Sequence, residues 1–380
     1  MSAKSKYALL PFSQLVYDMT RWMPGVYRFP ATLRWKDGVK EKDRIENAFR
    51  RALENHPIFS MQVDRNGMHY ASQLKDTLHG KYHSFSLIED GNDVLIHAEL
   101  NRILGDGRSL EIFLEDVERA YKRLALEPDD YWGYVARYEQ KKTEPHYTIS
   151  HDWVINEFAD DSFPVRPTID RRWLTTLFPP KAGLYEDNYA ALHSKIERLK
   201  TELFISYEGI FSLAAALAIA EYCGTDAAAL TWAYEGRELP EEQRIFGSLH
   251  RDIPFQINHK SQIINHKSDL IRAARNQIRQ GIAHSDYPYT LTSPYNKRWN
   301  YAVNVLRVPD PEDLQSLTEL PLEIVSFPKQ KFAYALLDVE IHEKDQSLQL
   351  VYRYSATHYQ KESIKKFASL IRKYVEWLID

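Results

Sequence analysis

The sequence predicts a two-lobed α/β protein, and three observations support this prediction. The chain has 380 residues, which is long for a single hydrophobic core. Helix-like and strand-like periodicities occur in both halves, in an order compatible with two similar α/β lobes. Between them, the proline-rich stretch 143–190 lacks long periodic runs and indicates an irregular linker. We therefore place one lobe at 1–165, and the linker with the second lobe at 166–380.

The composition is that of a soluble globular protein, with 44% hydrophobic and 27% charged residues. Lys plus Arg is 49 and Asp plus Glu is 53, which gives a net charge of −4 and argues against a nucleic-acid-binding surface over the whole protein. The single cysteine, Cys223, excludes a disulfide framework and a multi-cysteine zinc site within the chain. It ends an apolar run, which favours a buried, inert thiol over a nucleophile.

The sequence shows no sign of export or membrane insertion. The start, "MSAKSKYALLPFSQ", has neither a long apolar core nor a small-residue cleavage site, so we expect no signal peptide. The longest apolar run, "IFSLAAALAIA", has 11 residues, whereas a membrane-spanning helix needs ~20. We therefore expect a cytoplasmic protein that does not bind membranes.

In the first half, "KDRIENAFRRALEN" places its apolar side chains on one helical face, and the helix should end before Pro57. Strands are predicted at "IFSMQV" and "HYAS", on either side of an Asn-Gly turn. "DVLIHAELN" alternates apolar and polar residues, as a strand does. After Gly107, Ser109 is predicted to cap a helix. The predicted inner face of that helix comprises Leu110, Phe113, Leu114, Val117, Tyr121 and Leu124.

In the second half, helices are predicted over 208–222, over 268–281 and from Lys361 to the end of the chain, because apolar residues recur there at helical spacing. "ALTWAYEG" and "YAVNVLRV" have the composition of strands. "FAYALLDVEIHE" and "SLQLVYRYS" predict a hairpin with "KDQ" at its tip. This half therefore also combines helices with a sheet.

A seven-residue frame lies between the predicted strand 93–101 and the helix after it: Asn101-Arg102-Ile103-Leu104-Gly105-Asp106-Gly107. It resembles the H-H-x-x-x-D-G signature of the condensation domains of nonribosomal peptide synthetases. Those domains belong to the superfamily of chloramphenicol acetyltransferase and related thioester-dependent acyltransferases. Further segments resemble family motifs in the family's order: "LENHPIFSM", "YWGYVARY", "YEGR", "FGSLHRDIPF" and "AHSDYPY". The resemblance spans nearly the whole chain.

The resemblance implies a fold of two chloramphenicol acetyltransferase-like lobes, which form a V-shaped pseudo-dimer with a tunnel at their interface. It also implies a thioester donor and a small-molecule acyl acceptor that enter from opposite faces. Each is held on coenzyme A or on the phosphopantetheine arm of an acyl or peptidyl carrier protein, so no cofactor is bound permanently. In active members the second histidine contacts the nucleophile, and the aspartate is usually structural.

Here Asn101 and Arg102 replace both histidines, and this changes the expected chemistry. An imidazole titrates near neutrality, whereas a guanidinium stays protonated and is a very poor base. Loss of a general base typically slows a reaction by ~10²–10⁴, so we expect His-based condensation to be weak or absent. For Arg102 we favour a structural ion pair with Asp106; the alternatives are binding of a substrate anion and a direct catalytic role. For Asp106 a structural role is favoured, and Gly107 should serve backbone geometry.

Four further residues are candidates for the site. His250, in "SLHRDIPF", could replace the missing base, and its alternative is a surface or latch histidine. Arg251 stands where the family often has asparagine, which adds positive charge. His284 and Tyr287 match the family's H-Q-D-x-P-F segment, and there we favour packing or loop-fixing roles. The resemblance places Arg251, His284 and Tyr287 along the interface or tunnel.

Metal and nucleotide chemistry are not expected. His79 and His83 have the spacing of one helical face, but the stretch "HGKYH" contains Gly80 and no cysteine or carboxylate. We therefore predict no metal site.

Three functions remain open from the sequence. The leading one is a condensation-like protein that binds an acyl or carrier-tethered ligand. The second is an active acyltransferase that relies on a basic substrate or on His250. The third is a recruitment platform for a partner protein.

Overall fold

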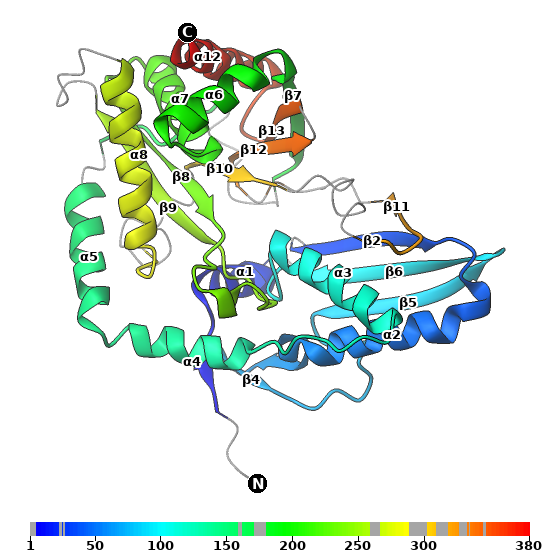
Figure 1. The fold of residues 1–380 in the computed structure, drawn as a ribbon. Helices are drawn as coiled ribbons and strands as arrows, with labels where there is room; N and C mark the ends of the chain where they lie inside the picture. The colour runs from blue at the N-terminus through cyan, green and yellow to red at the C-terminus, as the bar shows by residue number, and fades with distance from the viewer. Residues whose placement is uncertain are drawn as a thin grey trace. The chain divides into compact units, whose positions relative to one another are not determined.

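In a computed structural model of the protein, the described residues are 5–22, 25, 27–158, 162–170, 180–258, 267–288, 302–308, 318–326, 333, 335–344 and 347–380. The chain divides into two compact units (Figure 1). The first unit comprises Met1–Thr143, Glu235–His250 and Pro309–Lys329. The second comprises Glu144–Tyr234, Arg251–Val308 and Gln330–Asp380. Each combines helices with a sheet, so the predicted α/β class is confirmed.

The first unit is built on a four-stranded antiparallel sheet in the order β11-β2-β6-β5. These strands are β11 (Leu322–Ser326), β2 (Arg28–Trp35), β6 (Asp93–Asn101) and β5 (His83–Asp90). Two helices, α2 (Lys42–Asn55) and α3 (Gly107–Tyr121), pack against one another on this sheet. The rings of Phe49 in α2, Phe85 in β5 and Phe113 in α3 have centroids 5.6 to 5.9 Å apart. The sheet face that carries Phe85 is therefore the face that the two helices cover.

Smaller elements complete the first unit. They are β1 (Tyr7–Ala8), α1 (Pro11–Trp22), η1 (Val39–Glu41), η2 (Pro57–Ser60), β3 (Met61–Val63), β4 (Met68–Ala71), α4 (Tyr131–Lys141) and η4 (Pro240–Glu242). β1, β4 and β3 pair as a separate antiparallel sheet. The strand predicted from Ile58 begins only at Met61, because Phe59 N donates to His56 O (3.1 Å) and closes a 3-10 turn.

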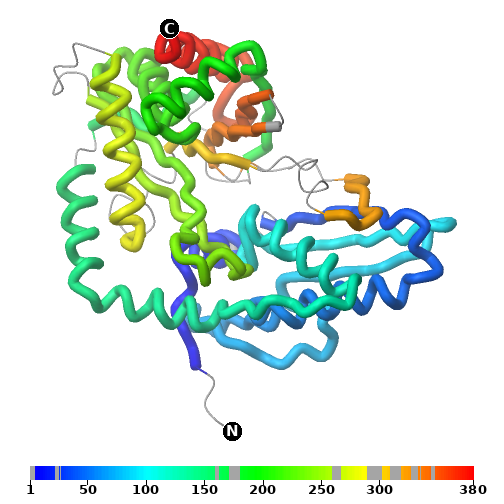
Figure 2. The backbone as a smooth tube through the Cα atoms, viewed as in Figure 1, coloured from blue at the N-terminus to red at the C-terminus, as the bar shows by residue number. Residues whose placement is uncertain are grey.

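The second unit contains a six-stranded mixed sheet in the order β7-β13-β12-β10-β8-β9. Its strands are β7 (Ala182–Asn188), β8 (Ala227–Tyr234), β9 (Arg251–Asn258), β10 (Val303–Arg307), β12 (Leu337–Lys344) and β13 (Ser347–Ser355). β10 runs parallel to β8 and β12, and the other pairs are antiparallel. The helical elements are α5 (Pro145–Phe158), η3 (Ala190–Leu192), α6 (His193–Leu203), α7 (Tyr207–Cys223), α8 (Lys267–Ala283) and α12 (Lys361–Ile379) (Figure 2).

Helix α7 is the centre of the second unit. Ser206 caps it by accepting a hydrogen bond from Gly209 N (3.2 Å), and Gly224 ends it with φ +67°. The helix is apolar all round, as expected for a helix buried on every side. It packs against β8, α8 and α12, and its residues from Gly209 to Ala220 are all buried. Cys223 at its end is half-buried rather than buried, and burial raises the pKa of its thiol.

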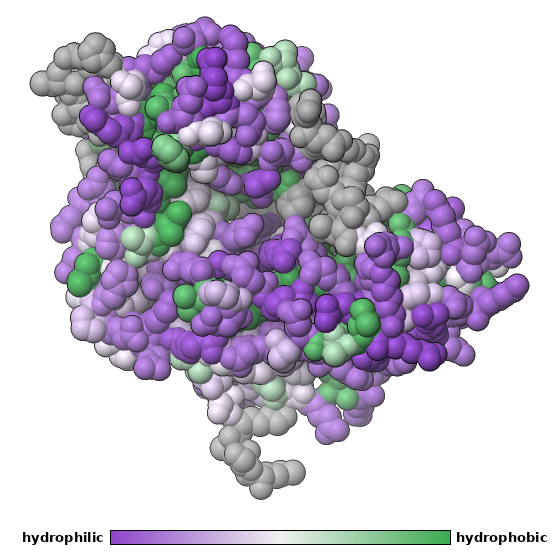
Figure 3. Space-filling view, in the orientation of Figure 1, coloured by the Kyte–Doolittle hydropathy of each residue, from purple (hydrophilic) through white to green (hydrophobic). Residues whose placement is uncertain are grey.

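Among the described residues, no single helix is long and apolar enough to cross a membrane. The two segments Ala190–Leu203 and Tyr207–Cys223 together have the required length and composition, but they meet at an angle of 106°. The face seen in Figure 3 is mostly hydrophilic, with apolar residues in small separate spots. Single apolar residues of this kind are normal on protein surfaces.

Most of the predicted elements are confirmed. They include α2, β4, β6, α7, β8, α8, β10, the β12–β13 hairpin and α12. Phe332, Tyr334 and the tip residues Asp345 and Gln346, which the hairpin prediction included, lie outside the described residues.

The linker prediction for 143–190 is wrong for two segments, because α5 and β7 are regular elements there; 159–161 and 171–179 lie outside the described residues. The predicted lobe boundary at 165/166 also differs from the division found, in which the second unit begins at Glu144. The physical reason is that Val154 and Phe158 of α5 pack with Val165, Ala229 and Ala302 in one apolar cluster.

The predicted inner face of α3 needs correction. Leu124 lies beyond the end of the helix and is 49% exposed, while Leu110 and Leu114 are only half-buried. The buried residues of α3 are Ser109, Ile112, Phe113, Asp116, Val117 and Ala120. The helix is rotated relative to the prediction because a hydrogen-bonded cap turns Ser109 inward.

Two phenylalanines in neighbouring elements offer a matched test of this core. Phe211 in α7 is 0% exposed, whereas Phe204, at the left-handed end of α6 (φ 51°), is 80% exposed. Phe211→Ala should lower the free energy of unfolding by about 3–5 kcal/mol, because it leaves a cavity. Phe204→Ala should change it by less than about 0.5 kcal/mol. Urea denaturation measures both, and equal effects would contradict the assignment of α7 as the core helix.

Candidate functional site

Residues 101–107, called here the motif turn, join the end of β6 to the start of α3. Asn101, the last residue of β6, is buried, and its side-chain Oδ1 accepts a hydrogen bond from Ile103 N (3.0 Å). The backbone N–H of Arg102 donates to Tyr27 O (2.9 Å), which ties the turn to the residue before β2. An asparagine that bonds the backbone two residues on stabilises a turn, so Asn101 gives this position a structural role.

Asp106 is the N-cap of α3, and the prediction that Ser109 caps the helix is wrong. The Asp106 carboxylate accepts hydrogen bonds from Ser109 N (3.1 Å) and Ser109 Oγ (2.8 Å). In return, Ser109 Oγ accepts from Asp106 N (3.2 Å), which completes a capping box with Ser109 in the third helical position. Gly107, the first residue of α3, does not have a positive φ, so its predicted backbone role does not rest on a left-handed conformation.

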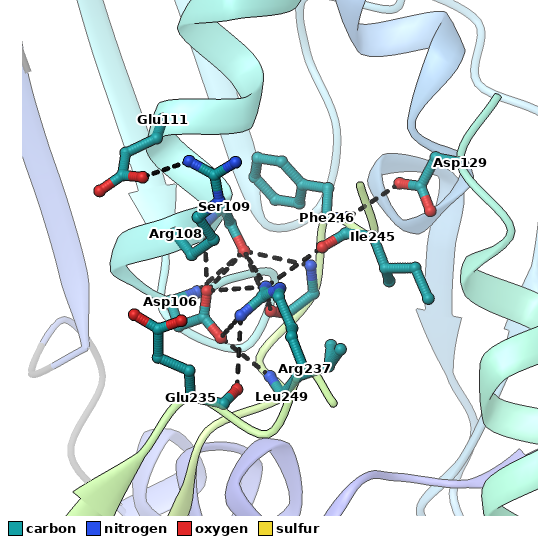
Figure 4. A network of polar contacts seen from close by, with 11 residues as sticks. Asp106, Arg108, Ser109, Glu111, Asp129, Glu235, Arg237, Ile245, Phe246 and Leu249 are labelled. Atoms are coloured by element: carbon teal, nitrogen blue, oxygen red, sulfur yellow. Dashed lines mark hydrogen bonds and ion pairs between the residues drawn. The ribbon is translucent and has the colours of Figure 1, made fainter. Parts of the chain in front are cut away.

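The Asp106 carboxylate forms a bidentate ion pair with Arg237 (Figure 4). Both Arg237 Nη1 to Asp106 Oδ2 and Arg237 Nη2 to Asp106 Oδ1 measure 3.0 Å. The side chain of Arg237 is 0% exposed and that of Asp106 is 8% exposed. Burial raises the pKa of Asp106, but the guanidinium and Ser109 outweigh it and hold that pKa below its ordinary value. The ion pair predicted between Arg102 and Asp106 is therefore wrong, because Arg237 takes the carboxylate.

Arg237 belongs to the segment Glu235–His250, called here the 235–250 segment. This segment leaves β8 and returns to β9, yet it is part of the first unit. Its Leu249 N donates to Asp106 Oδ2 (3.0 Å), and its Gly247 N donates to Ser109 Oγ (3.1 Å). A Cβ atom at Gly105 would lie 2.9 Å from the Phe246 ring, so the close approach of segment and turn requires glycine there.

Arg102 and His250 both lie close to one ring, that of Phe12 in α1. The Arg102 guanidinium lies 5.0 Å from the ring centroid, and the His250 ring centroid lies 3.8 Å from it. His250 Nδ1 is a buried atom without a hydrogen-bond partner among the described residues. Burial, and then the positive charge of Arg102, lower the pKa of His250 to about 3. His250 is therefore neutral at physiological pH and is a weak base.

The condensation-domain family model matches residues 85–380. The chain belongs to the condensation-domain family. No curated protein matches this condensation domain. One similar structure is the condensation domain of the Monacolin K polyketide synthase MokA, with a TM-score of 0.77 and 11% identity over 99% of this chain and 97% of that chain.

Two further structures are similar to this condensation domain. The EpoB cyclization-docking bidomain from Sorangium cellulosum has a TM-score of 0.76 and 14% identity, over 99% of this chain and 86% of that chain. A mutant starter condensation domain of rhizomide synthetase RzmA, in complex with C8-CoA, has a TM-score of 0.73 and 13% identity, over 99% and 94%. These likenesses confirm the predicted fold. The V-shaped arrangement with its tunnel stays a prediction.

In the second unit of the condensation domain, Arg251 begins β9. Its Nη1 donates to Ser285 Oγ (2.7 Å) and forms an ion pair with Asp286 Oδ1 (3.1 Å). These contacts join β9 to the segment that follows α8. Arg251 thus fixes the "HSDYP" segment, whereas its predicted place along a tunnel stays a prediction.

His284 contacts α5 on the other side of the same segment. Its Nδ1 lies 3.1 Å from Ser150 Oγ, and its ring stacks on that of Trp153 at 4.5 Å. Tyr287 makes edge contacts with Tyr147 (5.4 Å) and His151 (4.9 Å), both on α5. This geometry supports the packing and loop-fixing roles favoured for His284 and Tyr287.

One group in the second unit has donor atoms close enough for a metal ion: His193, Glu197 and Glu343, within 4.8 Å of one another. Lys200 Nζ lies 2.7 Å from Glu197, and Arg307 Nη2 lies 2.5 Å from Glu343. These ion pairs account for the carboxylates without an ion. The absence of a metal site therefore stays a prediction.

The Asp106–Arg237 pair can be tested through stability. Arg237→Ala should lower the free energy of unfolding by about 3–5 kcal/mol, because it leaves the Asp106 carboxylate buried without a cation. Arg198→Ala is the control, since that side chain is 64% exposed and pairs with Glu202 at 3.8 Å. It should change stability by less than about 1 kcal/mol. Similar losses in both variants would contradict the structural role of Arg237.

The ionisation of His250 can be followed by NMR of the histidine ring carbons. Its resonances should stay those of a neutral imidazole as the pH falls to about 4, given a pKa of about 3. Arg102→Ala should raise the pKa of His250, because it removes a nearby cation. A wild-type midpoint near the ordinary value of 6.5 would restore His250 as a candidate base.

Proposed function

We propose that this condensation domain binds an acyl group held as a thioester on coenzyme A or on a carrier protein, and that it has little or no His-based condensation activity. The observation that carries the proposal is the chemistry of the motif turn. Asn101 and Arg102 stand in place of the two histidines, and the nearby His250 has a pKa lowered to about 3.

None of these three side chains can readily accept a proton from a nucleophile near neutral pH. An amide does not titrate in the working range, and a guanidinium keeps its proton. An imidazole with a pKa of about 3 binds a proton roughly 10⁴-fold more weakly than one with a pKa near 7. An incoming amine or alcohol would have to lose its proton by another route, which slows the reaction by ~10²–10⁴.

The rest of the motif turn is intact, which favours retained ligand binding over a collapsed site. Asp106 caps α3 and pairs with Arg237, and the 235–250 segment closes on the turn through Leu249 and Gly247. The similar starter condensation domain of rhizomide synthetase is in complex with C8-CoA. That complex supports a coenzyme A thioester as the ligand class, and a carrier-tethered thioester presents the same chemistry. A small-molecule acyl acceptor completes the proposal.

The test uses octanoyl-CoA as the probe. Isothermal titration calorimetry should show binding to the wild-type protein. Release of free coenzyme A, followed with a thiol reagent, should not rise when amines or alcohols are added. Arg102→His supplies an imidazole at the altered position and should raise acceptor-dependent release at least about tenfold, whereas Arg102→Ala should not.

Each other outcome contradicts part of the proposal. Robust wild-type turnover that is lost in Arg102→Ala would show that the guanidinium is catalytic. Turnover that survives in Arg102→Ala but is lost in His250→Ala would establish the acyltransferase that uses His250. Failure to bind octanoyl-CoA or an octanoyl-carrier protein would overturn the ligand and leave the recruitment platform as the better account.

A further inference from the structure

A buried histidine of the first unit, His56, lies between two buried carboxylates. In the sequence it is far from the motif turn. His56 follows α2 and is 1% exposed, and the side chains of Asp116 and Asp129 are 0% exposed. His56 Nδ1 lies 2.8 Å from Asp129 Oδ2, and His56 Nε2 lies 3.2 Å from Asp116 Oδ2. In the sequence His56 lies within "LENHPIFSM", and no local pattern marks it as a functional residue.

This geometry favours the charged form of His56. A neutral imidazole has one N–H, so one of its nitrogens would turn a lone pair toward a carboxylate. The imidazolium donates a hydrogen bond from Nδ1 to Asp129, whereas its Nε2 lies at ion-pair distance from Asp116 and has no hydrogen-bond partner among the described residues. Its positive charge neutralises carboxylate charge that would otherwise be buried without compensation. Burial lowers the pKa of His56, but Asp116 and Asp129 outweigh it and raise that pKa above its ordinary value.

The charged and polar groups around His56 come from four elements. Asp116 and Glu115 lie on α3, Asp129 and Glu127 lie on the loop before α4, Arg244 lies on the 235–250 segment, and Asn55 ends α2. The rings of Phe59, Phe113 and Phe246 surround the imidazole, with centroids 5.1 to 6.4 Å from it.

The two carboxylates differ in how much they depend on His56. Asp116 also binds Arg244 and accepts from Asn55 Nδ2 (2.8 Å). Asp129 Oδ2 accepts from His56 and from the backbone N–H of Phe246 (3.1 Å), and its Oδ1 has no hydrogen-bond partner among the described residues. Within the described part of the chain, His56 is thus the cation at ion-pair distance from Asp129, and a neutral His56 would leave that buried charge uncompensated.

Both carboxylates hold the 235–250 segment. Asp129 binds the Phe246 backbone, and Asp116 binds the Arg244 side chain. The same segment carries Arg237, the partner of Asp106, and His250, which packs on Phe12 beside Arg102. The His56 cluster is therefore a second anchor for the segment, at Arg244 and Phe246.

We propose that His56 is a positioning residue: in its charged form it anchors the 235–250 segment through Asp116 and Asp129, and so fixes Arg237 against the motif turn. The anchor should hold fully below the ordinary histidine value of 6.5. It should weaken as the pH rises through the raised pKa of folded His56, because the proton is then lost. Weaker acyl-ligand binding at alkaline pH is a second consequence, and it rests on the proposed function.

Hydrogen exchange tests the anchor without any ligand. Exchange of peptides from the 235–250 segment, corrected for the intrinsic pH dependence, is compared with that of α2 and β6 between about pH 6 and about pH 9. In the wild-type protein, protection of the segment should fall at least about tenfold across this range, while α2 and β6 change little. His56→Gln should show the low protection at every pH.

Two variants complete the design. His97→Gln is the matched control, because His97 is exposed on β6 and bonds Thr32 at 3.1 Å; it should keep the wild-type profile. Asp129→Asn removes one carboxylate and should shift the loss of protection to lower pH. If His56→Gln does not fold, this shift and the NMR titration of His56 in the wild-type protein still decide the proposal.

Two outcomes overturn the proposal. One is a wild-type segment whose protection does not depend on pH. The other is a loss in His56→Gln that is equal across the whole first unit, which would make His56 a core residue only. If the exchange results are as expected but octanoyl-CoA does not bind at any pH, the proposed function fails and the positioning role of His56 stands.

Discussion

The buried ion pair between Asp106 and Arg237 is the interaction on which the candidate site depends. It joins residues 131 positions apart, and both side chains are almost fully removed from water. Separating them would leave an uncompensated charge in the protein interior, which is far more unfavourable than losing a surface pair. The contacts of Leu249 and Gly247 and the close approach at Gly105 require the two segments to stay together. Asp106 therefore has a structural role that does not depend on the chemistry of the motif.

Asn101 and Arg102 take no part in the ion pair between Asp106 and Arg237, and at these two positions the chain departs from the family pattern. The Asn101 side chain stabilises the turn, because its amide oxygen accepts a hydrogen bond from Ile103 N. Arg102 adds a permanent charge beside Phe12, and that charge helps to keep His250 neutral. Arg102 thus has two effects: it stands where the family has an imidazole, and it lowers the basicity of His250. This coupling is the basis of the proposal that the site binds an acyl ligand without His-based proton transfer.

Sequence periodicity predicted what depends on local chemistry. Helices α2, α7 and α12 and the β12–β13 hairpin follow from the spacing of apolar residues, and the motif order indicated the fold. The wrong predictions concern an ion pair whose partners lie far apart in the sequence and a helix that begins at a proline. Arg102 is close in sequence to Asp106, but Arg237 is the partner, and no local pattern identifies a pair so far apart. The proline-rich composition of 143–190 indicated a linker, whereas proline is well suited to the first turn of a helix, and Pro145 begins α5. His56 was missed because its two carboxylates come from separate elements.

The two anchors of the 235–250 segment respond to pH in opposite directions. Asp106 has a pKa lowered below its ordinary 3.8, so its contribution is present above that value and is lost as the pH falls through the folded pKa. His56 has a raised pKa, so its contribution is complete below 6.5 and is lost at alkaline pH. Between these limits both pairs are charged and the segment is held at two places. A segment held in this way can keep Arg237 and His250 fixed near neutral pH without help from the motif histidines that this chain lacks.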